Sequence, residues 1–254
     1  MSVRREFALG GAGFAITLLA WEIAGRQLGD VLLAPPSTVF PLLASMLAEG
    51  KVLRELGDTL GQLCIGFTMA CAVGMPLGVL MGRSRIVDAL VHPWVSMLVV
   101  TSVAALVPIY ILIFGTGVAM RIAIVFTGSV GYVLLTAYHG ARGIDTRIVD
   151  AARSFSTSGS ALYRKVLLPA LYPYLMTGAR LGLVHAIRAM IMAEMFVITG
   201  YGGLIFQTGL DLSVAPLLAY LALLMIVGTV ASRTLQVLGD ATAPWYASRI
   251  QQQQ

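Results

Sequence analysis

Charged residues are scarce in this sequence. Of its 254 residues, 11% are charged and 58% are hydrophobic, and the mean hydropathy is +0.86. A soluble domain carries about 25% charged residues, and a chain of this size with so little charge could not cover its surface with polar groups in water. The two cysteines, Cys64 and Cys71, lie in one apolar run, which excludes a disulfide scaffold. The composition therefore predicts an integral membrane protein.

Motifs for catalysis, metal binding and nucleotide binding are also absent. No His-Glu-x-x-His occurs, and the three histidines are far apart, so we expect neither a catalytic nor a metal site. The only lysines, Lys51 and Lys165, are each followed by valine, which excludes a Gly-x-x-x-x-Gly-Lys-Ser/Thr phosphate loop. No basic run interleaved with aromatics indicates nucleic acid. We expect a chain that is not an enzyme and that holds no cofactor itself.

Long apolar runs predict the architecture. A helix needs about 20 apolar residues to cross the hydrocarbon of a bilayer. The chain has six such runs, so we predict an all-α integral membrane protein with about six spans in a single domain, residues 1–254. The predicted spans are residues 7–25, 59–81, 94–114, 119–138, 173–198 and 214–238.

The distribution of basic residues predicts the orientation, because Lys and Arg are enriched on the cytoplasmic side. With both termini in the cytoplasm, the external segments hold Arg26, Lys51 and Arg54, with Arg121 near the mouth of the fourth span. The cytoplasmic segments then hold eleven basic residues: Arg4, Arg5, Arg83, Arg85, Arg142, Arg147, Arg153, Arg164, Lys165, Arg233 and Arg249. The bias favours an orientation with both termini in the cytoplasm. We expect membrane lipid to surround the spans.

The long polar stretch between the fourth and fifth spans, residues 141–172, predicts a helix pair on the cytoplasmic side. Asp145 can cap its first helix and Pro169 can end its second, with a break near Ser156. Ala151, Ala152 and Phe155 share one apolar face of the first helix. We interpret this pair as a docking element for a partner, with an amphipathic connector lying on the bilayer as the alternative.

The fifth span carries two different faces. At 3.6 residues per turn, small residues from Gly178 to Ala193 fall in one arc, and Thr177, Arg180, Arg188 and Glu194 fall in the opposite arc. Charged residues within a span face a cavity or a partner, so we expect the small face to pack on another helix and the charged face to line a pathway. Two alternatives stay open: Arg180 snorkels to the interface, and Arg188 and Glu194 form interhelical ion pairs.

Several motifs together resemble those of the nitrate/sulfonate/taurine-type permease family of ABC importers. They are residues 33–39 (LAPPSTV), 74–85 (GMPLGVLMGRSR), Asp150-Ala151-Ala152 with Leu168-Pro169 after the standard interval, 167–180 (LLPALYPYLMTGAR) and Ala193-Glu194-Met195. The chain departs from the family pattern at four positions. Asp150 stands where Glu is usual, Ser156 where Gly is expected, His185 where Arg is frequent, and Arg188 where the family is commonly apolar.

The resemblance implies a permease subunit with a type I importer fold in a bacterial cytoplasmic (inner) membrane. It implies pairing with a second copy or a close relative, two ATPase subunits that hold ATP and Mg²⁺, and an external substrate-binding protein. It places ATPase docking at Asp150, Ala151, Ala152, Phe155, Ser156, Leu168 and Pro169. Together with the charged arc, it predicts a path for a small anion, such as nitrate, a sulfonate, bicarbonate or an organic acid, along Arg180, His185, Arg188 and Glu194.

Two other classes of protein compete with this interpretation. One is a self-contained carrier or channel that needs no ATPase, although no inverted repeat is visible in the sequence. The other is an intramembrane serine peptidase built on Ser129 and His185. Serine in a membrane helix is usually a packing or hydrogen-bonding residue, and no oxyanion-hole motif accompanies this one.

Overall fold

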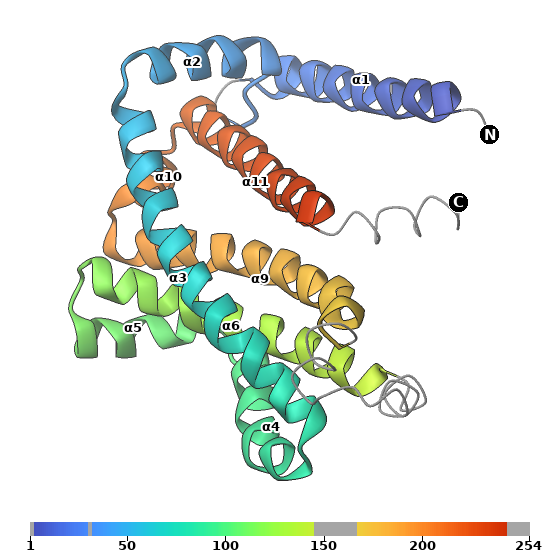
Figure 1. Ribbon diagram of the computed structural model, residues 1–254. Helices are drawn as coiled ribbons and strands as arrows, with labels where there is room; N and C mark the ends of the chain where they lie inside the picture. The colour runs from blue at the N-terminus through green and yellow to red at the C-terminus, as the bar shows by residue number, and fades with distance from the viewer. Residues whose placement is uncertain (1–2, 30–31, 145–166, 243–254) are drawn as a thin grey trace.

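The computed structural model describes residues 3–29, 32–144 and 167–242, and the side chains of these residues from Leu9 onward. Within these ranges the regular structure is entirely α-helical (Figure 1). The helices are α1 (Val3–Leu28), α2 (Pro36–Ala48), α3 (Lys51–Arg83), α4 (Arg85–Val100), α5 (Val103–Phe114), α6 (Val118–Gly143), α9 (Leu168–Val197), α10 (Gly200–Leu210) and α11 (Val214–Thr242).

Three long helices, α3, α6 and α9, form the centre of the molecule, with α6 packed against both of the others. Glycines of α3 let it approach α6 closely, as the four-residue glycine spacing predicts. A Cβ at Gly74 would lie 3.1 Å from the Val130 carbonyl oxygen, and one at Gly82 would lie 2.6 Å from the Ala141 Cβ. These contacts bring the last turn of α3 level with the last turn of α6.

The predicted span 94–114 is bent in the structure, whereas the predicted span 173–198 is one continuous helix, α9, that bends only where it ends. α4 and α5 meet at an angle of 104°, so residues 94–114 do not form the single continuous helix that was predicted. The break lies at Thr101 and Ser102, where Thr101 has extended backbone angles and its hydroxyl donates to the Met97 carbonyl oxygen. α9 and α10 meet at 59°.

Length and hydropathy qualify three described helices as membrane spans: α3, α6 and α11. The two bent pairs raise this number to five if each pair crosses as one span. α1 contains the predicted span 7–25 as part of a longer helix, but it is not among the helices that qualify in the described part of the chain. The structure therefore supports three to five of the six predicted spans.

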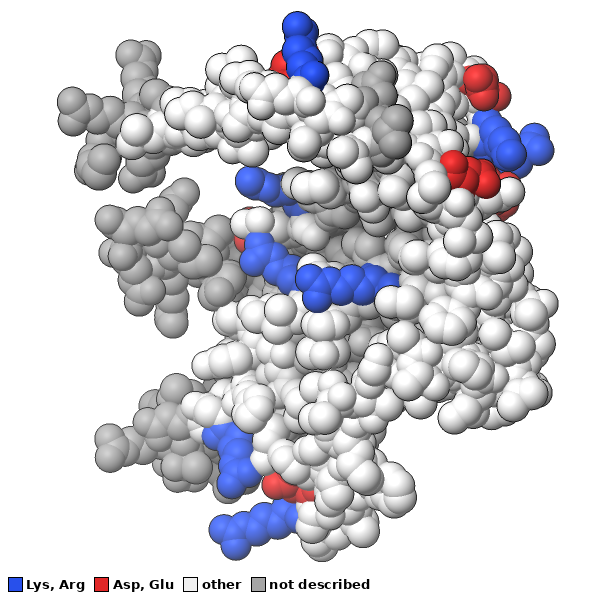
Figure 2. Space-filling model, turned by 180° about the vertical axis from the view of Figure 1, so that it is seen from behind, with Lys and Arg blue, Asp and Glu red and all other residues white. Residues whose placement is uncertain are grey.

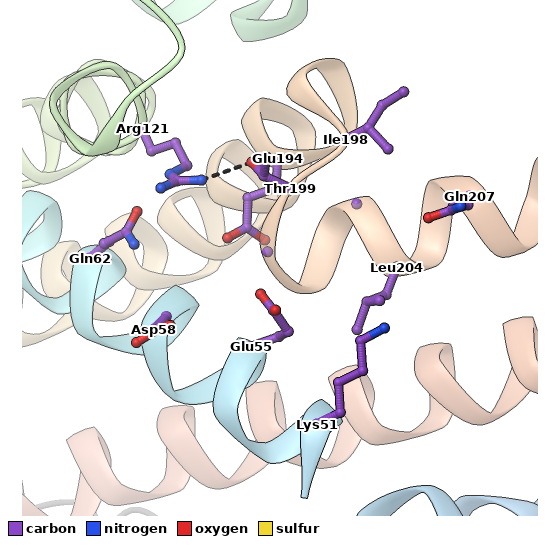
Figure 3. Close-up of a pocket in the computed structure, with 12 residues that line it drawn as sticks. Lys51, Glu55, Asp58, Gln62, Arg121, Glu194, Ile198, Thr199, Leu204 and Gln207 are labelled. Atoms are coloured by element: carbon purple, nitrogen blue, oxygen red, sulfur yellow. Dashed lines mark hydrogen bonds between the residues drawn. The ribbon is translucent and has the colours of Figure 1, made fainter.

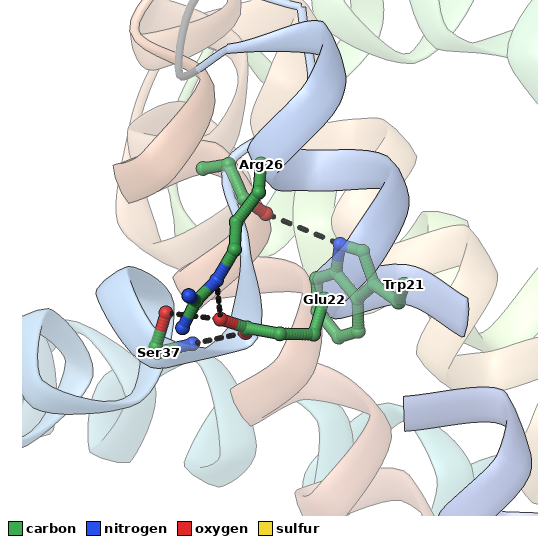
Figure 4. A network of polar contacts seen from close by, with 5 residues as sticks. Trp21, Glu22, Arg26 and Ser37 are labelled. Carbon is green, nitrogen blue, oxygen red and sulfur yellow. Dashed lines mark hydrogen bonds and ion pairs between the residues drawn. The ribbon is translucent and has the colours of Figure 1, made fainter. Parts of the chain in front are cut away.

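The N-terminal helix α1 is tied to α2 by a polar network (Figure 4). The Glu22 carboxylate accepts hydrogen bonds from the Ser37 amide (3.1 Å), the Ser37 hydroxyl (2.8 Å) and Arg26 Nε (2.6 Å). The Trp21 indole N–H donates to the Ala34 carbonyl oxygen. α2 in turn packs against α11 in an apolar cluster that includes Val39, so α1, α2 and α11 form one side of the molecule (Figure 1).

Candidate translocation site

The small-residue face of α9 packs on α6, as the sequence predicts. A Cβ at Gly178 would lie 3.1 Å from the Thr136 Cβ, and one at Gly182 would lie 2.5 Å from Val133 Cγ2. Ala186, Ala189 and Ala193 are buried along the same helix. This face of α9 is buried against α6, and only the opposite, exposed side of α9 can contact a solute or another helix.

The exposed side of α9 forms one wall of a groove whose other wall is α11. The groove has a volume of about 710 Å³ and is lined by Arg180, Arg188 and Arg233, together with Thr229 and apolar side chains such as Val184. Figure 2 shows basic side chains along a hollow that crosses this face of the molecule. The structure thus brings the two predicted arginines of α9 together and adds a third.

No acidic side chain lines this groove. Among the described residues, the side chains of Arg180, Arg188 and Arg233 make neither an ion pair nor a hydrogen bond. An arginine in a membrane helix is costly unless something compensates its charge. The groove therefore has the electrostatic character of a site for anions.

The sequence predicts Arg233 on the cytoplasmic side of the membrane, without assigning it to the pathway. Arg233 lies inside the predicted span 214–238, five residues before its end. A charged residue within a span faces a cavity or a partner, so this position could have assigned Arg233 to the pathway. α11 lies against α9 in the structure, and this contact brings Arg233 to the same groove as Arg180.

Glu194 does not lie in the arginine groove. It is 1% exposed, and its carboxylate accepts hydrogen bonds from the Thr59 hydroxyl of α3 (2.6 Å) and from the Gly202 amide of α10 (2.8 Å). The Thr59 oxygen also accepts from the Tyr201 amide (3.2 Å). α10 leaves α9 at an angle of 59°, and its first turn packs against the last turns of α9 and covers the side of the helix that the helical projection assigned to the pathway. The expectation that Glu194 shares an open face with Arg188 is therefore wrong.

The turn that covers Glu194 depends on backbone conformations that few residues adopt. Ile198 has φ +55° and Gly200 has φ +65°, and both lie in the left-handed region. A Cβ at Gly202 would lie 2.6 Å from the Ile191 carbonyl oxygen, so only glycine allows α10 to approach α9 here. Glu194 thus fixes the junction of α3, α9 and α10.

Replacing Glu194 by alanine should destabilise the protein by about 1–3 kcal/mol, because the Thr59 hydroxyl and the Gly202 amide would lose a buried acceptor. Glu194→Gln should cost less, since its amide oxygen keeps one acceptor in place. Glu55→Ala is the matched control, because Glu55 lines the adjacent pocket without a described hydrogen bond. Thermal unfolding of the purified variants measures the difference. Equal unfolding temperatures for Glu194→Ala and Glu55→Ala would contradict this role.

A second pocket, of about 450 Å³, opens beside Glu194 (Figure 3). Its lining carries both signs of charge, with Lys51 and Arg121 as the bases and Glu55 and Asp58 as the acids beside Glu194. Arg121 Nη1 donates to the Thr199 hydroxyl at 2.8 Å, which connects α6 to the turn before α10. This pocket lies at the ends of α3 and α9 opposite to Arg83 and Leu168, and therefore at the external end in the predicted orientation.

His185 lies one turn before Arg188 but does not line the arginine groove. Its ring stacks on Tyr132 of α6, with 3.5 Å between ring centroids and 10° between planes. Ser129 is fully buried, and its hydroxyl donates to the Val125 carbonyl oxygen at 2.7 Å. Its hydroxyl is thus engaged within its own helix, and nothing in this geometry supports the serine-peptidase alternative.

Comparison with known proteins assigns the family. Residues 74–243 match the model of the binding-protein-dependent transport system inner membrane component. The chain belongs to this family. It is therefore a permease subunit of an ABC importer, and the self-contained carrier has no support.

Curated relatives of the permease cover most of its length. It is 24% identical to the taurine transport system permease protein TauC of Escherichia coli, over 95% of this chain and 91% of the relative. It is 24% identical to the putative aliphatic sulfonates transport permease protein SsuC of Bacillus subtilis, over 91% of this chain and 85% of the relative. It is 29% identical to the bicarbonate transport system permease protein CmpB of Synechococcus elongatus, over 77% and 73%.

The fold of the permease is similar to that of a chain in the inward-facing MetNI methionine ABC transporter. The TM-score is 0.64 at 21% sequence identity, and the match covers 76% of this permease and 94% of that chain. This likeness agrees with an all-helical type I importer fold.

The predicted docking residues Asp150, Ala151, Ala152, Phe155 and Ser156 lie outside the residues that the structure describes. Leu168 and Pro169 are described, and they begin α9, with proline in the first turn where its missing N–H is tolerated. The helix that Pro169 is predicted to end precedes α9 and lies outside the described residues. The predicted coupling segment 141–172 therefore includes the end of α6 (Gly143) and the first turn of α9.

Proposed function

We propose that two copies of this permease, or one copy and a close relative, form the path by which a small anionic solute enters the cell. Two separate ATPase subunits bind and hydrolyse ATP with Mg²⁺, and a substrate-binding protein delivers the solute from outside. Family membership supports the assignment of the path to this permease and of ATP hydrolysis and solute delivery to other subunits. The absence of a phosphate-loop motif in the sequence agrees with it, because the nucleotide then belongs to another chain.

The observation that carries the proposed cargo is the groove between α9 and α11. It presents Arg180, Arg188 and Arg233 without an acidic side chain in its lining. Arg180 and Arg188 are eight residues apart, or about 12 Å along the helix, so a solute moving along α9 passes from one guanidinium to the next. The planar guanidinium matches carboxylate and sulfonate groups through paired hydrogen bonds.

The proposed orientation places the coupling segment and both termini in the cytoplasm of a bacterial cell. The N-terminal end of α1 and the C-terminal end of α11 lie on the same side of the molecule as the C-terminal end of α6 and the N-terminal end of α9 (right-hand side of Figure 1). ATP-driven closure of the ATPases moves the coupling segment and, through α6 and α9, shifts the population between inward-open and outward-open states.

Uptake into proteoliposomes tests this proposal. The permease is reconstituted with its ATPase and its substrate-binding protein, and radiolabelled sulfonates, carboxylates and their uncharged amide or alcohol analogues are compared. We expect ATP-dependent uptake of an anion, and at least tenfold less uptake of its uncharged analogue, because the guanidinium hydrogen bonds are lost. Uptake that persists without the ATPase, or that ignores the charge of the solute, would contradict the proposal.

A further inference from the structure

A second arginine cluster lies at the opposite end of α3 from the mixed-charge pocket. Arg83 ends α3, Arg85 begins α4, and Arg142 lies in the last turn of α6. Together with Ser84 and Asp88 they line a small, partly enclosed pocket of about 270 Å³. Figure 2 shows basic side chains beside an acidic one at the lower end of the molecule, where α4 lies in Figure 1. The translocation path uses none of these residues.

The charges in this pocket are not balanced. Asp88 is the one acid of its lining. Its Oδ2 atom accepts from the Tyr138 hydroxyl (3.1 Å) and lies 3.5 Å from Arg142 Nη1, and its buried Oδ1 atom lies 3.3 Å from His92 Nδ1 without a hydrogen bond among the described residues. The Nε and Nη2 atoms of Arg83 are buried and have no hydrogen-bond partner among the described residues. Buried donors without an acceptor are costly, so the pocket has two unneutralised positive charges and open donors for an anion.

The first turn of α4 adds to this preference. α4 is 16 residues long, and Ser84 caps it by accepting from the Val87 amide. The positive end of the helix dipole therefore points into the pocket beside Arg83 and Arg85. The backbone amides of α4 and the arginine side chains both favour an anion.

An apolar stripe runs along α4 from this pocket. Ile86, Leu90, Trp94 and Met97 are between 54% and 74% exposed, and their spacing of four, four and three residues places them on one face of the helix. The stripe covers twelve residues, and its first and last members are about 16 Å apart along the helix axis. This is close to the thickness of one leaflet of the hydrocarbon core, about 15 Å.

We propose that this pocket binds the phosphate headgroup of an anionic phospholipid of the cytoplasmic leaflet, whose acyl chains lie along the α4 stripe. The arginines supply the charge, the small pocket accommodates one phosphate, and the stripe begins one residue after Arg85 and has the length of an acyl chain. A free phosphate would use the pocket but not the stripe, and a second protein copy would use the stripe but not the pocket. The lipid uses both.

Quenching of Trp94 fluorescence by dibrominated lipids tests the proposal. The full-length permease and its Trp94→Phe variant are reconstituted into phosphatidylcholine vesicles that contain dibrominated phosphatidylglycerol or dibrominated phosphatidylcholine. The difference between the two proteins isolates Trp94 from the other tryptophans. Since each arginine near an anionic headgroup contributes about fivefold in binding, we expect phosphatidylglycerol to be preferred by about 20- to 30-fold. Arg83→Gln/Arg85→Gln should reduce this preference to near one.

The control variant is Arg26→Gln/Arg54→Gln, which removes the same charge at the external end and should keep the preference. An equal loss in the control, or equal quenching by both lipids in the wild-type protein, would overturn the proposal. Loss of the preference in millimolar inorganic phosphate would show that the pocket takes a soluble anion instead. Efficient cross-linking between copies through Leu90→Cys would show that a second copy covers the stripe, which also overturns it.

Discussion

Replacing Arg188 by alanine should reduce anion transport by about 10- to 100-fold while the transporter complex still assembles. The expected size corresponds to the loss of one charge-assisted hydrogen bond of about 1.5–3 kcal/mol between the guanidinium and the solute. Arg188 is exposed in the groove and has no described acidic partner, so its removal leaves no buried charge behind. Uptake into proteoliposomes, measured beside the yield of the purified complex, separates transport from assembly.

Two further variants sharpen this prediction. Arg188→Lys should restore only part of the transport, because lysine keeps the charge but lacks the planar fork that binds a carboxylate or sulfonate at two atoms. Arg54→Ala removes an exposed arginine at the external end of α3 and should leave transport nearly unchanged. Full transport by Arg188→Ala in an intact complex would show that this arginine is structural or idle.

Replacing Ala152 by arginine should uncouple ATP hydrolysis from transport or release the ATPase. The substitution puts a long charged side chain on the apolar face that the sequence predicts to dock the ATPase, where a desolvated charge without a partner costs several kcal/mol. ATPase activity with and without the binding protein, together with copurification of the ATPase, measures coupling and docking separately.

Ala241→Arg is the control for this variant, because Ala241 is exposed in the last turn of α11 and takes the same substitution. It should assemble and transport normally. If Ala152→Arg did so as well, the assignment of the docking face to residues 150–152 would be wrong.

The helix packing at the centre of the molecule could be predicted from the sequence, but the break between α4 and α5 could not. The glycine spacings of residues 74–82 and 178–182 predict close helix contacts, because only small residues allow backbones to approach. The break at Thr101 and Ser102 has no comparable signal. Pro108 is the conspicuous helix breaker in this region, yet it lies inside α5.

The sequence predicts only part of the candidate site, because it shows the faces of one helix but not the contacts between helices. A helical projection gives the side of α9 on which a residue lies, and it placed Arg180 and Arg188 on one exposed side. It does not show what covers that side, and Glu194 is buried because the first turn of α10 packs against the last turns of α9. Arg233 belongs to another helix, so only the tertiary contact between α9 and α11 brings it to the groove.

The central claim is that the groove between α9 and α11 is an anion path, and the reactivity of a cysteine in it is the most direct test. Val184→Cys lines the groove, and Ile226→Cys, next to the groove residue Met225 but outside the lining, is the control. Both are made in a chain in which Cys64 and Cys71 are replaced by alanine, and a negatively charged and a positively charged methanethiosulfonate reagent of similar size are compared. The account predicts that the anionic reagent labels Val184→Cys at least tenfold faster, that the transported solute slows this labelling, and that Ile226→Cys shows neither effect. Equal rates for the two reagents, or no labelling at Val184→Cys in any nucleotide state, would contradict it.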